Sequence, residues 1–568
     1  MVQTLLQGLF VCATTWLLWK AFRKFVVKSD LDNLPGPPSP SFMYGHVREL
    51  YNKQTGFKYH RSLGEKYGPV VRLRGRFGSN LVYTFDPKAM HSIAIKDQDI
   101  FQEATWFTKL TLLASDRATG IIFGPGLFAT LGDHHRKQRK MLNPVFSVNH
   151  MRNMSPIFYD ITHKLRTAIQ DRVREGHPAE VNIVSWMGRT ALELMGQGGL
   201  GYSFDPLIAD AGDEYGKALK DLMPTLAQVR GLHHHVPLFQ KIVPKGWRRA
   251  VAELIPAPPL QRIIQIADTM RIRSTEIFEA KKKALLAGDE ALKHQIGEGR
   301  DLISVLLREN MAAAEEDKLP EEELIGQMSY PLTVTPRTMT FAAMDSTSNA
   351  LSLTLWRLAQ HPERQDALRK EILEAKEAHG GGDIGYDELV ALPYLDAVCR
   401  ETLRVHTPAP FRFRETNRDV ILPLSEPVRG KDGRMMHELH IPKNTSVFVG
   451  INASNTNPAL WGPDAYEWKP ERWLEPLPET VLNARIPGVY ANLMTFWGGG
   501  RSCVGFKFSQ LEMKVVLAVL LSTFTFELTE KPIYWNMATV QYPSTDPHGA
   551  HPELPMKVGL LKRDSVRA

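Results

Sequence analysis

The sequence predicts a mainly α-helical protein with small β-sheets, formed by one large domain behind an apolar N-terminal segment. From about residue 150 to Glu401, apolar side chains follow a mostly helical pattern. Short runs rich in Val, Leu, Tyr and Phe lie on either side of this stretch and are typical of strands. The chain has 568 residues and 43% hydrophobic content, which is enough for a sizeable core. Length alone would allow several domains, but no linker or internal repeat follows the first forty residues.

The first nineteen residues carry no charged side chain, and four basic residues follow between positions 20 and 28. At about 1.5 Å per residue, a helix of this length is just long enough to cross a bilayer core of about 30 Å. The basic flank belongs on the cytosolic side. A cleaved signal peptide is the alternative, but no charged region precedes the apolar residues and no small-residue cleavage site follows them. Residues 1–28 are therefore predicted to be a transmembrane anchor with its basic flank.

Residues 29–40 contain the run LPGPPSP, whose prolines predict a stiff hinge. We expect residues 41–568 to form the single folded domain. Within it, strand-forming residues predict short strands at 66–75, 79–87, 419–424, 437–443 and 445–452.

The most informative motif lies near the C-terminus, where FWGGGRSCVGF fits the pattern F-x-x-G-x-R-x-C-x-G. Its single cysteine, Cys503, is flanked by glycines, and Arg501 stands two positions before it. The glycines at 498–500 allow a tight turn and remove side chains that would hold a flat ligand away. A helix that begins near Gly505 would point its N-terminal amides toward the sulfur, which favours the thiolate. A glycine turn with an inert cysteine is the alternative.

This segment resembles the haem-ligand loop of cytochrome P450 haem-thiolate monooxygenases, and the chain as a whole resembles microsomal members of fungal type. The resemblance implies the cytochrome P450 fold, with haem between a long central helix and the cysteine loop. It implies that Cys503 is the axial ligand of the iron and that the cofactor is haem b, iron protoporphyrin IX. In the family, an E-x-x-R pair and a later arginine lock the haem-side core. Here these residues are Glu401, Arg404 and Arg472, with a structural role.

Haem carries two propionates, so its site needs cations and hydrogen-bond donors. By resemblance, Arg501 and Arg414 have this role, the latter from its place ten residues after Arg404. His135 and Arg139, in the run GDHHRKQRK, are further candidates. The family commonly has Trp-x-x-x-Arg at this place, so His135 stands where the family has tryptophan. Taken alone, the basic run would be interpreted as a solvated helix face.

Residues 342–347, AAMDST, resemble the A-G-x-D-T-T element on the long central helix of the family. There an acid and an alcohol supply protons on the oxygen side of the haem, and Asp345 and Ser346 are the candidates. Serine in place of the usual threonine keeps the hydroxyl but leaves it less restricted at χ1. Alone, the segment would fit any helix with scattered serine and threonine.

Eight residues just before this element, Tyr330–Arg337, interrupt the expected helix with Pro331 and Pro336. An interior proline costs about 3 kcal/mol or more in a helix. Without the eight residues the helical pattern is continuous. Two interpretations stay open, a misplaced splice boundary in the gene model and a genuine surface bulge.

The other two cysteines, Cys12 and Cys399, form no C-x-x-C pair and are interpreted as small apolar fillers. Such sparing use of cysteine indicates a reducing compartment. The run His233–His235 lacks the i, i+4 spacing of a metal site on one helical face, so we assign it to the surface. The segment around Trp247 either dips into the membrane, by analogy with microsomal members, or forms an ordinary helix pair broken by proline.

The resemblance implies a monooxygenase that inserts one oxygen atom from O2 into a hydrophobic small molecule, by hydroxylation or epoxidation. Fungal members suggest a terpenoid or another secondary metabolite. Electrons would come from NADPH through NADPH-cytochrome P450 reductase, with cytochrome b5 as an optional second donor, and the net charge of +7 suits an acidic partner. Five apolar residues of the expected roof loop imply an apolar guest: Trp106, Phe107, Ile121, Ile122 and Phe123.

The expected location is the endoplasmic reticulum membrane, with a single pass and a cytosolic catalytic domain, and no nucleic-acid partner is expected. Two other functions stay open. One is a haem-thiolate isomerase or dehydratase that consumes no O2, against which the pair Asp345 and Ser346 argues. The other is a non-catalytic haem-binding protein, which only the interrupted helix suggests.

Overall fold

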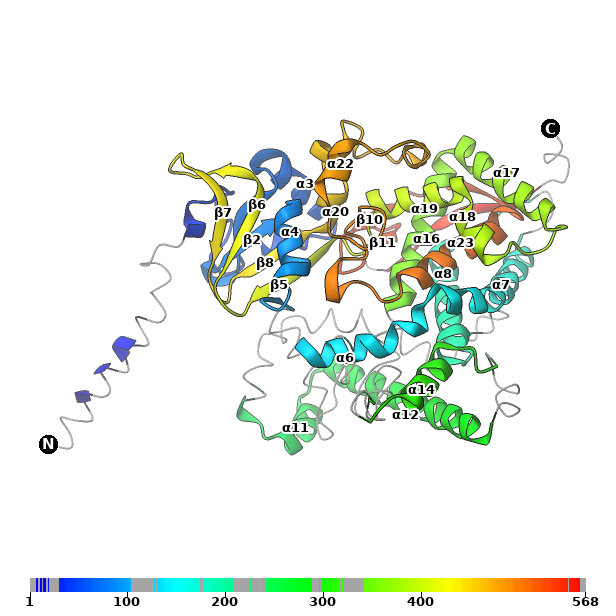
Figure 1. Cartoon of the computed structure of the whole chain (residues 1–568), viewed down its shortest axis with the longest axis horizontal. Helices are drawn as coiled ribbons and strands as arrows, with labels where there is room; N and C mark the ends of the chain where they lie inside the picture. Colours follow the sequence, from blue (N-terminus) through cyan, green and yellow to red (C-terminus); the bar gives the residue numbers. More distant parts are fainter. Residues whose placement is uncertain are drawn as a thin grey trace.

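The computed structural model has a large helical part and a smaller part rich in β-strands (Figure 1). It describes residues 7–8, 11–12, 14–16, 19, 30–103, 127, 130–173, 177–205, 207, 225, 239, 241–288, 296, 298–315, 318–319, 342–549 and 551–561. Several expected features lie outside these residues: most of the anchor 1–28, the roof-loop residues 106–107 and 121–123, the histidines 233–235 and the segment 330–337. Within the described part of the chain, no helix has both the length and the apolar character needed to cross a bilayer.

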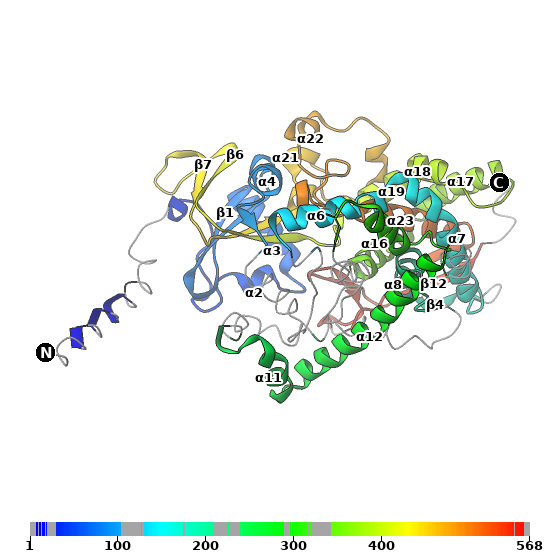
Figure 2. The same cartoon turned by 60° about the horizontal axis from the view of Figure 1, so that its bottom comes forward.

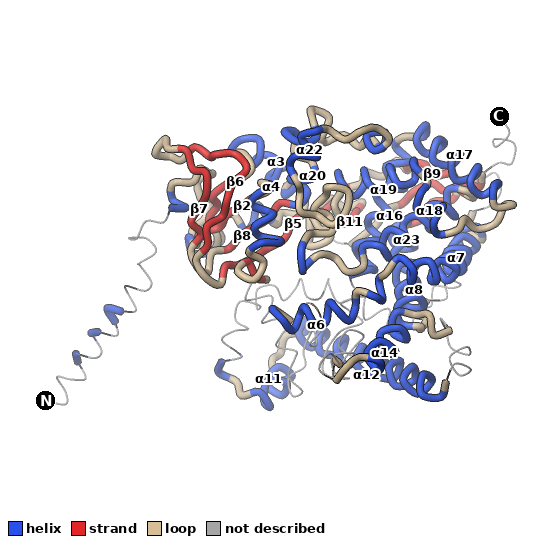
Figure 3. Tube along the Cα trace, viewed as in Figure 1, coloured by secondary structure: helices blue, strands red, loops and turns tan. Residues whose placement is uncertain are grey.

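A five-stranded sheet organises the smaller part. Its strand order is β1 (Val70–Arg74), β2 (Asn80–Thr84), β8 (Ser446–Gly450), β5 (Phe411–Thr416) and β3 (Phe101–Gln102). Strands β2 and β8 are parallel, and the other neighbours are antiparallel. A separate antiparallel pair consists of β6 (Val420–Arg429) and β7 (Met435–Ile441). The structure thus confirms the predicted strands, which gather at one end of the molecule (Figure 3).

The main helices of the larger part are α7 (Val148–Gln170), α8 (Ile183–Leu194), α16 (Ala342–Gln360), α19 (Pro393–Val405) and α23 (Phe506–Leu521). Helix α23 is buried continuously from Leu511 to Leu521, because most side chains of this stretch are apolar. Helix α16 contacts both α8 and α23. It therefore lies between the rest of the helical core and the helix that follows Cys503.

One short strand interrupts the stretch between residue 150 and Glu401 that was expected to be mostly helical. Strand β4 (Ala179–Asn182) pairs with β12 (Pro555–Leu560), which also pairs with β9 (Phe524–Leu528). Only one of its four residues, Val181, is buried. A strand this short is set by its distant partner rather than by its own pattern, so the local sequence did not predict it.

The described residues also form helices α2 (Val47–Leu50), α3 (Gly56–Tyr67), α4 (Pro87–His91), α6 (Gly132–Leu142), α11 (Arg248–Leu254), α12 (Pro258–Ala287), α14 (Leu302–Ala312), α17 (Pro362–Ala378), α18 (Tyr386–Ala391), α20 (Ile451–Asn455), α21 (Pro458–Trp461) and α22 (Glu479–Ala484). The other strands are β10 (Tyr534–Asn536) and β11 (Tyr542–Ser544). Figure 2 shows α11 and α12 along one side of the molecule. Trp247, which directly precedes α11, is 69% exposed.

Candidate functional site: a cysteine loop beside a cluster of cations

Cys503 lies in the loop between a short 3-10 turn, η10 (Gly499–Arg501), and helix α23. The backbone amide of Cys503 donates to the carbonyl of Phe496 at 2.8 Å, which closes the loop. Gly505 occupies the N-cap position of α23, so the helix begins at Phe506, three residues after the cysteine. The side chain of Cys503 is exposed, whereas Cys399 is buried. The loop therefore presents one accessible sulfur at the N-terminus of a long buried helix.

Two opposing influences act on the thiol of Cys503. Although the side chain is accessible, the protein groups that surround it displace water from the sulfur, and this desolvation is the larger influence and raises the pKa of Cys503. The backbone amide of Gly505 and the charges of Arg412 and Arg139 oppose this effect and lower the pKa. The amides at the helix start therefore favour the thiolate, as expected, but they do not fully offset desolvation. A metal ion coordinated to the sulfur would supply the missing stabilisation, because coordination deprotonates a thiol.

Two glycines of the loop allow it to pack closely against other segments of the chain. A Cβ atom on Gly498 would overlap the carbonyl oxygen of Pro487, and one on Gly499 would overlap the carbonyl oxygen of Ala94. Gly499 also has a φ of +62°, which disfavours any side chain. The sequence interpretation placed these glycines beneath the ligand. The structure adds that two of them let the loop approach the backbone of neighbouring segments.

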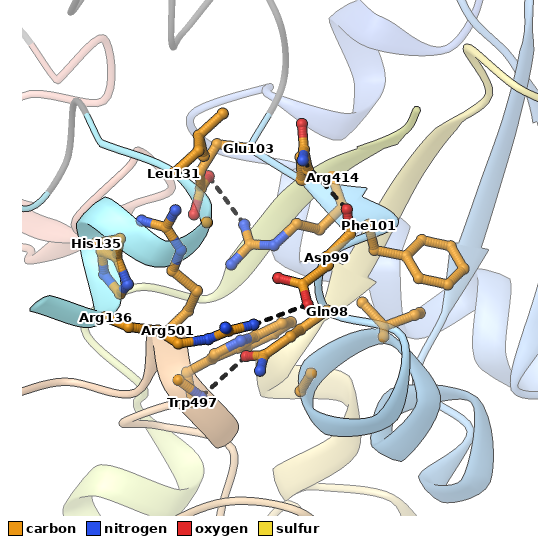
Figure 4. A pocket seen from close by; sticks show the side chains of 15 residues that line it. Gln98, Asp99, Phe101, Glu103, Leu131, His135, Arg136, Arg414, Trp497 and Arg501 are labelled. Carbon is orange, nitrogen blue, oxygen red and sulfur yellow. Dashed lines mark hydrogen bonds and ion pairs between the residues drawn. The ribbon is translucent and has the colours of Figure 1, made fainter. Parts of the chain in front are cut away.

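Three of the four predicted propionate ligands line one pocket, which Figure 4 shows: His135 from α6, Arg414 from β5 and Arg501 from the cysteine loop. Arg501 donates to the carbonyl oxygens of Thr130, at 2.7 Å, and Leu127, at 3.3 Å.

Arg139 differs from the other three predicted ligands, since its guanidinium contacts the cysteine loop directly. It donates to the carbonyl oxygen of Ser502, and to the Ser502 hydroxyl at 3.3 Å. Arg139 thus ties α6 to the residue before Cys503.

The charges of the site are predominantly positive. Burial, together with the neighbouring Arg501 and Arg139, lowers the pKa of His135 to about 3. His135 is therefore a neutral hydrogen-bonding group at physiological pH. Burial lowers the pKa of Arg501 to about 10, so this guanidinium keeps its charge. The arginines are therefore the residues whose positive charge can face the two expected propionates.

Glu401, Arg404 and Arg472 lie together in the core. Arg404 donates two hydrogen bonds to the Glu401 carboxylate, at 2.8 Å and 2.7 Å, and both side chains are completely buried. Arg472 approaches Glu401 at 3.6 Å and also pairs with Asp464 at 3.0 Å. The Arg404 guanidinium further donates to three backbone carbonyl oxygens, those of Asn455, Ala465 and Glu467. These contacts join α19 to the segment that precedes the cysteine loop.

Asp345 lies in the first turn of α16, and Ser346 is the next residue of the helix. Desolvation raises the pKa of Asp345 to about 6, so this carboxyl can hold a proton near neutral pH. The next residue, Thr347, is buried and its hydroxyl lies 3.1 Å from the hydroxyl of Ser509 on α23. Thr347 is therefore engaged with α23.

Comparison with known proteins decides the family. The cytochrome P450 family model matches residues 35–543. The chain belongs to the cytochrome P450 family. It is 50% identical to cytochrome P450 monooxygenase 91 of Postia placenta, over 98% of this chain and 99% of the relative. It is 48% identical to a ganoderic acid synthetase of Ganoderma lucidum, over 97% of this chain and 98% of the relative. A crystal structure of a cytochrome P450 has the same fold, with a TM-score of 0.66, 20% identity and coverage of 93% of this chain and all of that one.

As a cytochrome P450, the protein is an oxidoreductase with a haem-iron cofactor, and the residues of the site fit this group. An accessible sulfur, a helix N-terminus and a set of arginines together match an iron ligand and two carboxylates. Gly505 also leaves room, since an added Cβ would meet only Phe146, at an ordinary contact distance of 3.7 Å. Haem chemistry thus accounts for residues that come from separate parts of this cytochrome P450.

Sequence reasoning missed three residues of this cytochrome P450 site. Arg412 acts on the sulfur of Cys503, while Trp497 and Glu103 line the pocket with Arg414. The run FRFR at 411–414 contained a signal for Arg412, because alternate residues of a strand share a face and Arg412 therefore accompanies Arg414. No local pattern marked Glu103, whose role depends on the pairing of β3 with β5.

Proposed function

We propose that this cytochrome P450 is a haem b monooxygenase that inserts one oxygen atom from O2 into a hydrophobic small molecule, by hydroxylation or epoxidation. The observation that carries the proposal is the loop of Cys503, whose accessible sulfur lies at the start of α23 beside a pocket lined by arginines. When bound, the haem supplies the iron that activates O2, with electron density from the thiolate of Cys503.

Each predicted site residue has a role in this proposal. Arg139, Arg414 and Arg501 provide charge for the two carboxylates of the haem, and His135 provides a neutral hydrogen-bonding group. Glu401, Arg404 and Arg472 hold the segment before the cysteine loop in place. The Glu401 carboxylate accepts two hydrogen bonds from Arg404 and lies 3.6 Å from Arg472, and such pairing is the condition under which charges are tolerated in a core.

Proton supply is assigned to α16. The raised pKa of Asp345 lets its carboxyl hold a proton near neutral pH, and the Ser346 hydroxyl is adjacent in sequence. This acid-alcohol pair favours an oxygen-consuming reaction over an isomerase or dehydratase. It equally favours catalysis over a merely haem-binding protein.

The substrate class that we favour is a terpenoid or another secondary metabolite. A relative named as a ganoderic acid synthetase shares 48% identity over nearly the whole chain, and this supports the terpenoid choice. Electrons come from NADPH through NADPH-cytochrome P450 reductase, with cytochrome b5 as an optional second donor. The net charge of +7 suits such acidic partners.

We place the protein at the endoplasmic reticulum membrane, with residues 1–28 as a single-pass anchor, 29–40 as the hinge and 41–568 as the cytosolic catalytic domain. The uncharged first nineteen residues and their basic flank support this assignment. Trp247, 69% exposed beside α11, supports a second membrane contact. A chain that starts at Leu34 should then lose stable anchoring and keep its haem.

The function is tested by expressing the full chain with the reductase in a host that is fed candidate terpenoids, fatty acids and aromatics. NADPH consumption, untargeted product analysis and labelling with heavy-isotope O2 are measured together. We expect products that carry one labelled oxygen atom. A product without labelled oxygen would indicate an isomerase or dehydratase, and haem binding without any product or NADPH use would indicate a binding protein.

A further inference from the structure

Two acidic side chains, Asp99 and Glu103, line the pocket together with its cations, and Glu103 is the one that pairs with a predicted propionate ligand. Glu103 follows β3 directly, and its Oε2 accepts a hydrogen bond from Nη1 of Arg414 at 2.9 Å (Figure 4). The backbone sets up this pair. Strands β3 and β5 are antiparallel with Gln102 opposite Glu415, so the next position places Glu103 beside Arg414. The contact therefore follows from strand register and does not depend on a flexible side chain finding its partner.

Arg414 is held on two further sides. Its Nη1 also donates to the carbonyl oxygen of Phe413 at 2.8 Å, and its guanidinium lies over the ring of Trp497 at 4.9 Å from the centroid. The side chain is only 4% exposed. Among the described residues, Nε and Nη2 of Arg414 make no hydrogen bond within the protein. These two donors remain for a ligand in the pocket, while Nη1 is occupied by the protein itself.

Glu103 also acts on the other arginines. Its negative charge raises the pKa of Arg412 and Arg501, and thereby opposes burial, which lowers both. Arg414 has the opposite effect on these two residues, because like charges repel. Without Glu103, less negative charge would offset the mutual repulsion of the three neighbouring arginines. The acid therefore allows the cations to be packed close together.

We propose that Glu103 is a positioning residue, which fixes Arg414 so that Nε and Nη2 face a carboxylate of the bound haem. This inference rests on the proposed function, in which Arg414 binds a haem propionate. Glu103 itself repels a carboxylate, but orientation outweighs this repulsion. A buried arginine that loses its acid partner is both misplaced and uncompensated, and breaking such a pair is costly.

The test measures the rate at which haem leaves the full-length holoprotein for apomyoglobin. We expect Glu103→Ala to accelerate haem loss about tenfold, the effect of losing a hydrogen bond to a charged group. Glu103→Gln keeps an acceptor oxygen and should lie between the parent and the alanine variant. Asp133→Asn is the matched control. Asp133 pairs with the exposed Arg136 at 2.5 Å and is not among the described residues that line the pocket, so its replacement should change the rate less than about twofold.

A double-mutant cycle separates positioning from general loosening of the fold. In a chain that already carries Arg414→Ala, adding Glu103→Ala should cause no further acceleration, because the residue through which Glu103 acts is absent. An equal acceleration in both backgrounds would overturn the proposal, as would slower or unchanged haem loss in Glu103→Ala. If Glu103→Ala fails to fold, Glu103→Gln in the same cycle gives the answer.

The same measurements distinguish failure of this inference from failure of the proposed function. Unchanged haem loss in Arg414→Ala would remove Arg414 from the haem site, and the role of Glu103 with it. A parent chain that takes up no haem would overturn the proposed function as a whole. Normal haem binding by the parent, fast loss from Arg414→Ala and parent-like loss from Glu103→Ala would overturn the role of Glu103 alone.

Discussion

The hydroxyl of Thr347 lies 3.1 Å from the hydroxyl of Ser509, and this hydrogen bond joins α16 to α23. One helix carries the candidate proton donors, and the other begins three residues after the candidate iron ligand Cys503. The bond therefore fixes the N-terminal part of α16 against the helix that leaves the cysteine loop. It also engages the alcohol that stands next to Ser346, which makes Thr347 a poor substitute for the Ser346 hydroxyl.

This geometry sharpens the expected effect of Ser346→Ala. The variant should keep haem binding and reduction, because the hydroxyl is not an iron ligand. Positioned proton transfer is typically worth about 10²–10⁴-fold in rate, and we expect about 10²-fold here, since water can still reach the site. NADPH use should continue while a larger share of the electrons ends as hydrogen peroxide. Product and peroxide formed per NADPH are the quantities to measure.

Two matched variants show which of the two neighbouring hydroxyls takes part in proton transfer. Ser346→Thr should preserve or improve coupling, because the added methyl group restricts χ1. Thr347→Ala should affect thermal stability more than coupling, because it removes the bond to Ser509. Parent-like coupling in Ser346→Ala together with poor coupling in Thr347→Ala would move the proton relay to Thr347.

Coupling should also depend on pH through Asp345, whose pKa burial raises to about 6. The folded state holds this proton more tightly than an exposed aspartate, so the acid is mostly protonated below about pH 6 and loses its proton above it. The share of electrons found in product should therefore fall as pH rises through about 6. Asp345→Asn should abolish this fall in coupling with rising pH. A parent and variant with the same pH profile of coupling would show that Asp345 does not deliver the proton.

The fold should be sensitive to the buried pair of Glu401 and Arg404. Glu401→Gln leaves two buried guanidinium groups without their carboxylate, and breaking such a pair typically costs about 3–5 kcal/mol. We expect a large drop in the thermal midpoint and in the yield of soluble haem protein. Glu65→Gln is the control, since Glu65 pairs with Arg61 on an exposed helix face where both side chains are 51% exposed. Equal losses in the two variants would exclude the proposed locking role.

Gly499→Ala should destabilise the cysteine loop. The position has a φ of +62°, and a Cβ there would overlap the carbonyl oxygen of Ala94. Strain of this kind costs about 1–3 kcal/mol. Gly385→Ala offers a matched control, because a Cβ at Gly385 meets nothing within 4 Å and its φ is −60°. Haem retention and thermal midpoint should fall only in the first variant, and equal behaviour would refute the packing role of Gly499.

Motifs that are local in the sequence predicted their geometry well. Glu401 and Arg404 are three residues apart on one helix, and the spacing alone brings their side chains together. The loop of Cys503 and the start of α23 likewise follow from neighbouring residues. The predicted strands were correct where apolar residues and turns mark them, whereas the short strand β4 depends on β12 and was missed.

Contacts between distant segments could not be predicted in this way. Glu103 and Arg414 are 311 positions apart, and only the register of β3 and β5 makes them partners. Gly498 and Gly499 were correctly marked as a tight turn. The atoms they avoid belong to Pro487 and Ala94, and no local pattern identifies these neighbours. The direction of Thr347 toward Ser509 depends in the same way on how α16 packs against α23.

The central claim, that Cys503 binds the haem iron as a thiolate, is tested most directly by the absorption spectrum of the reduced carbon monoxide complex. The parent should give the thiolate-type spectrum. Cys503→Ala should lose both this spectrum and the activity, while Cys399→Ala, which changes a buried cysteine on α19, should keep them. A Cys503→Ala variant that retains the thiolate-type spectrum and the activity would contradict the account.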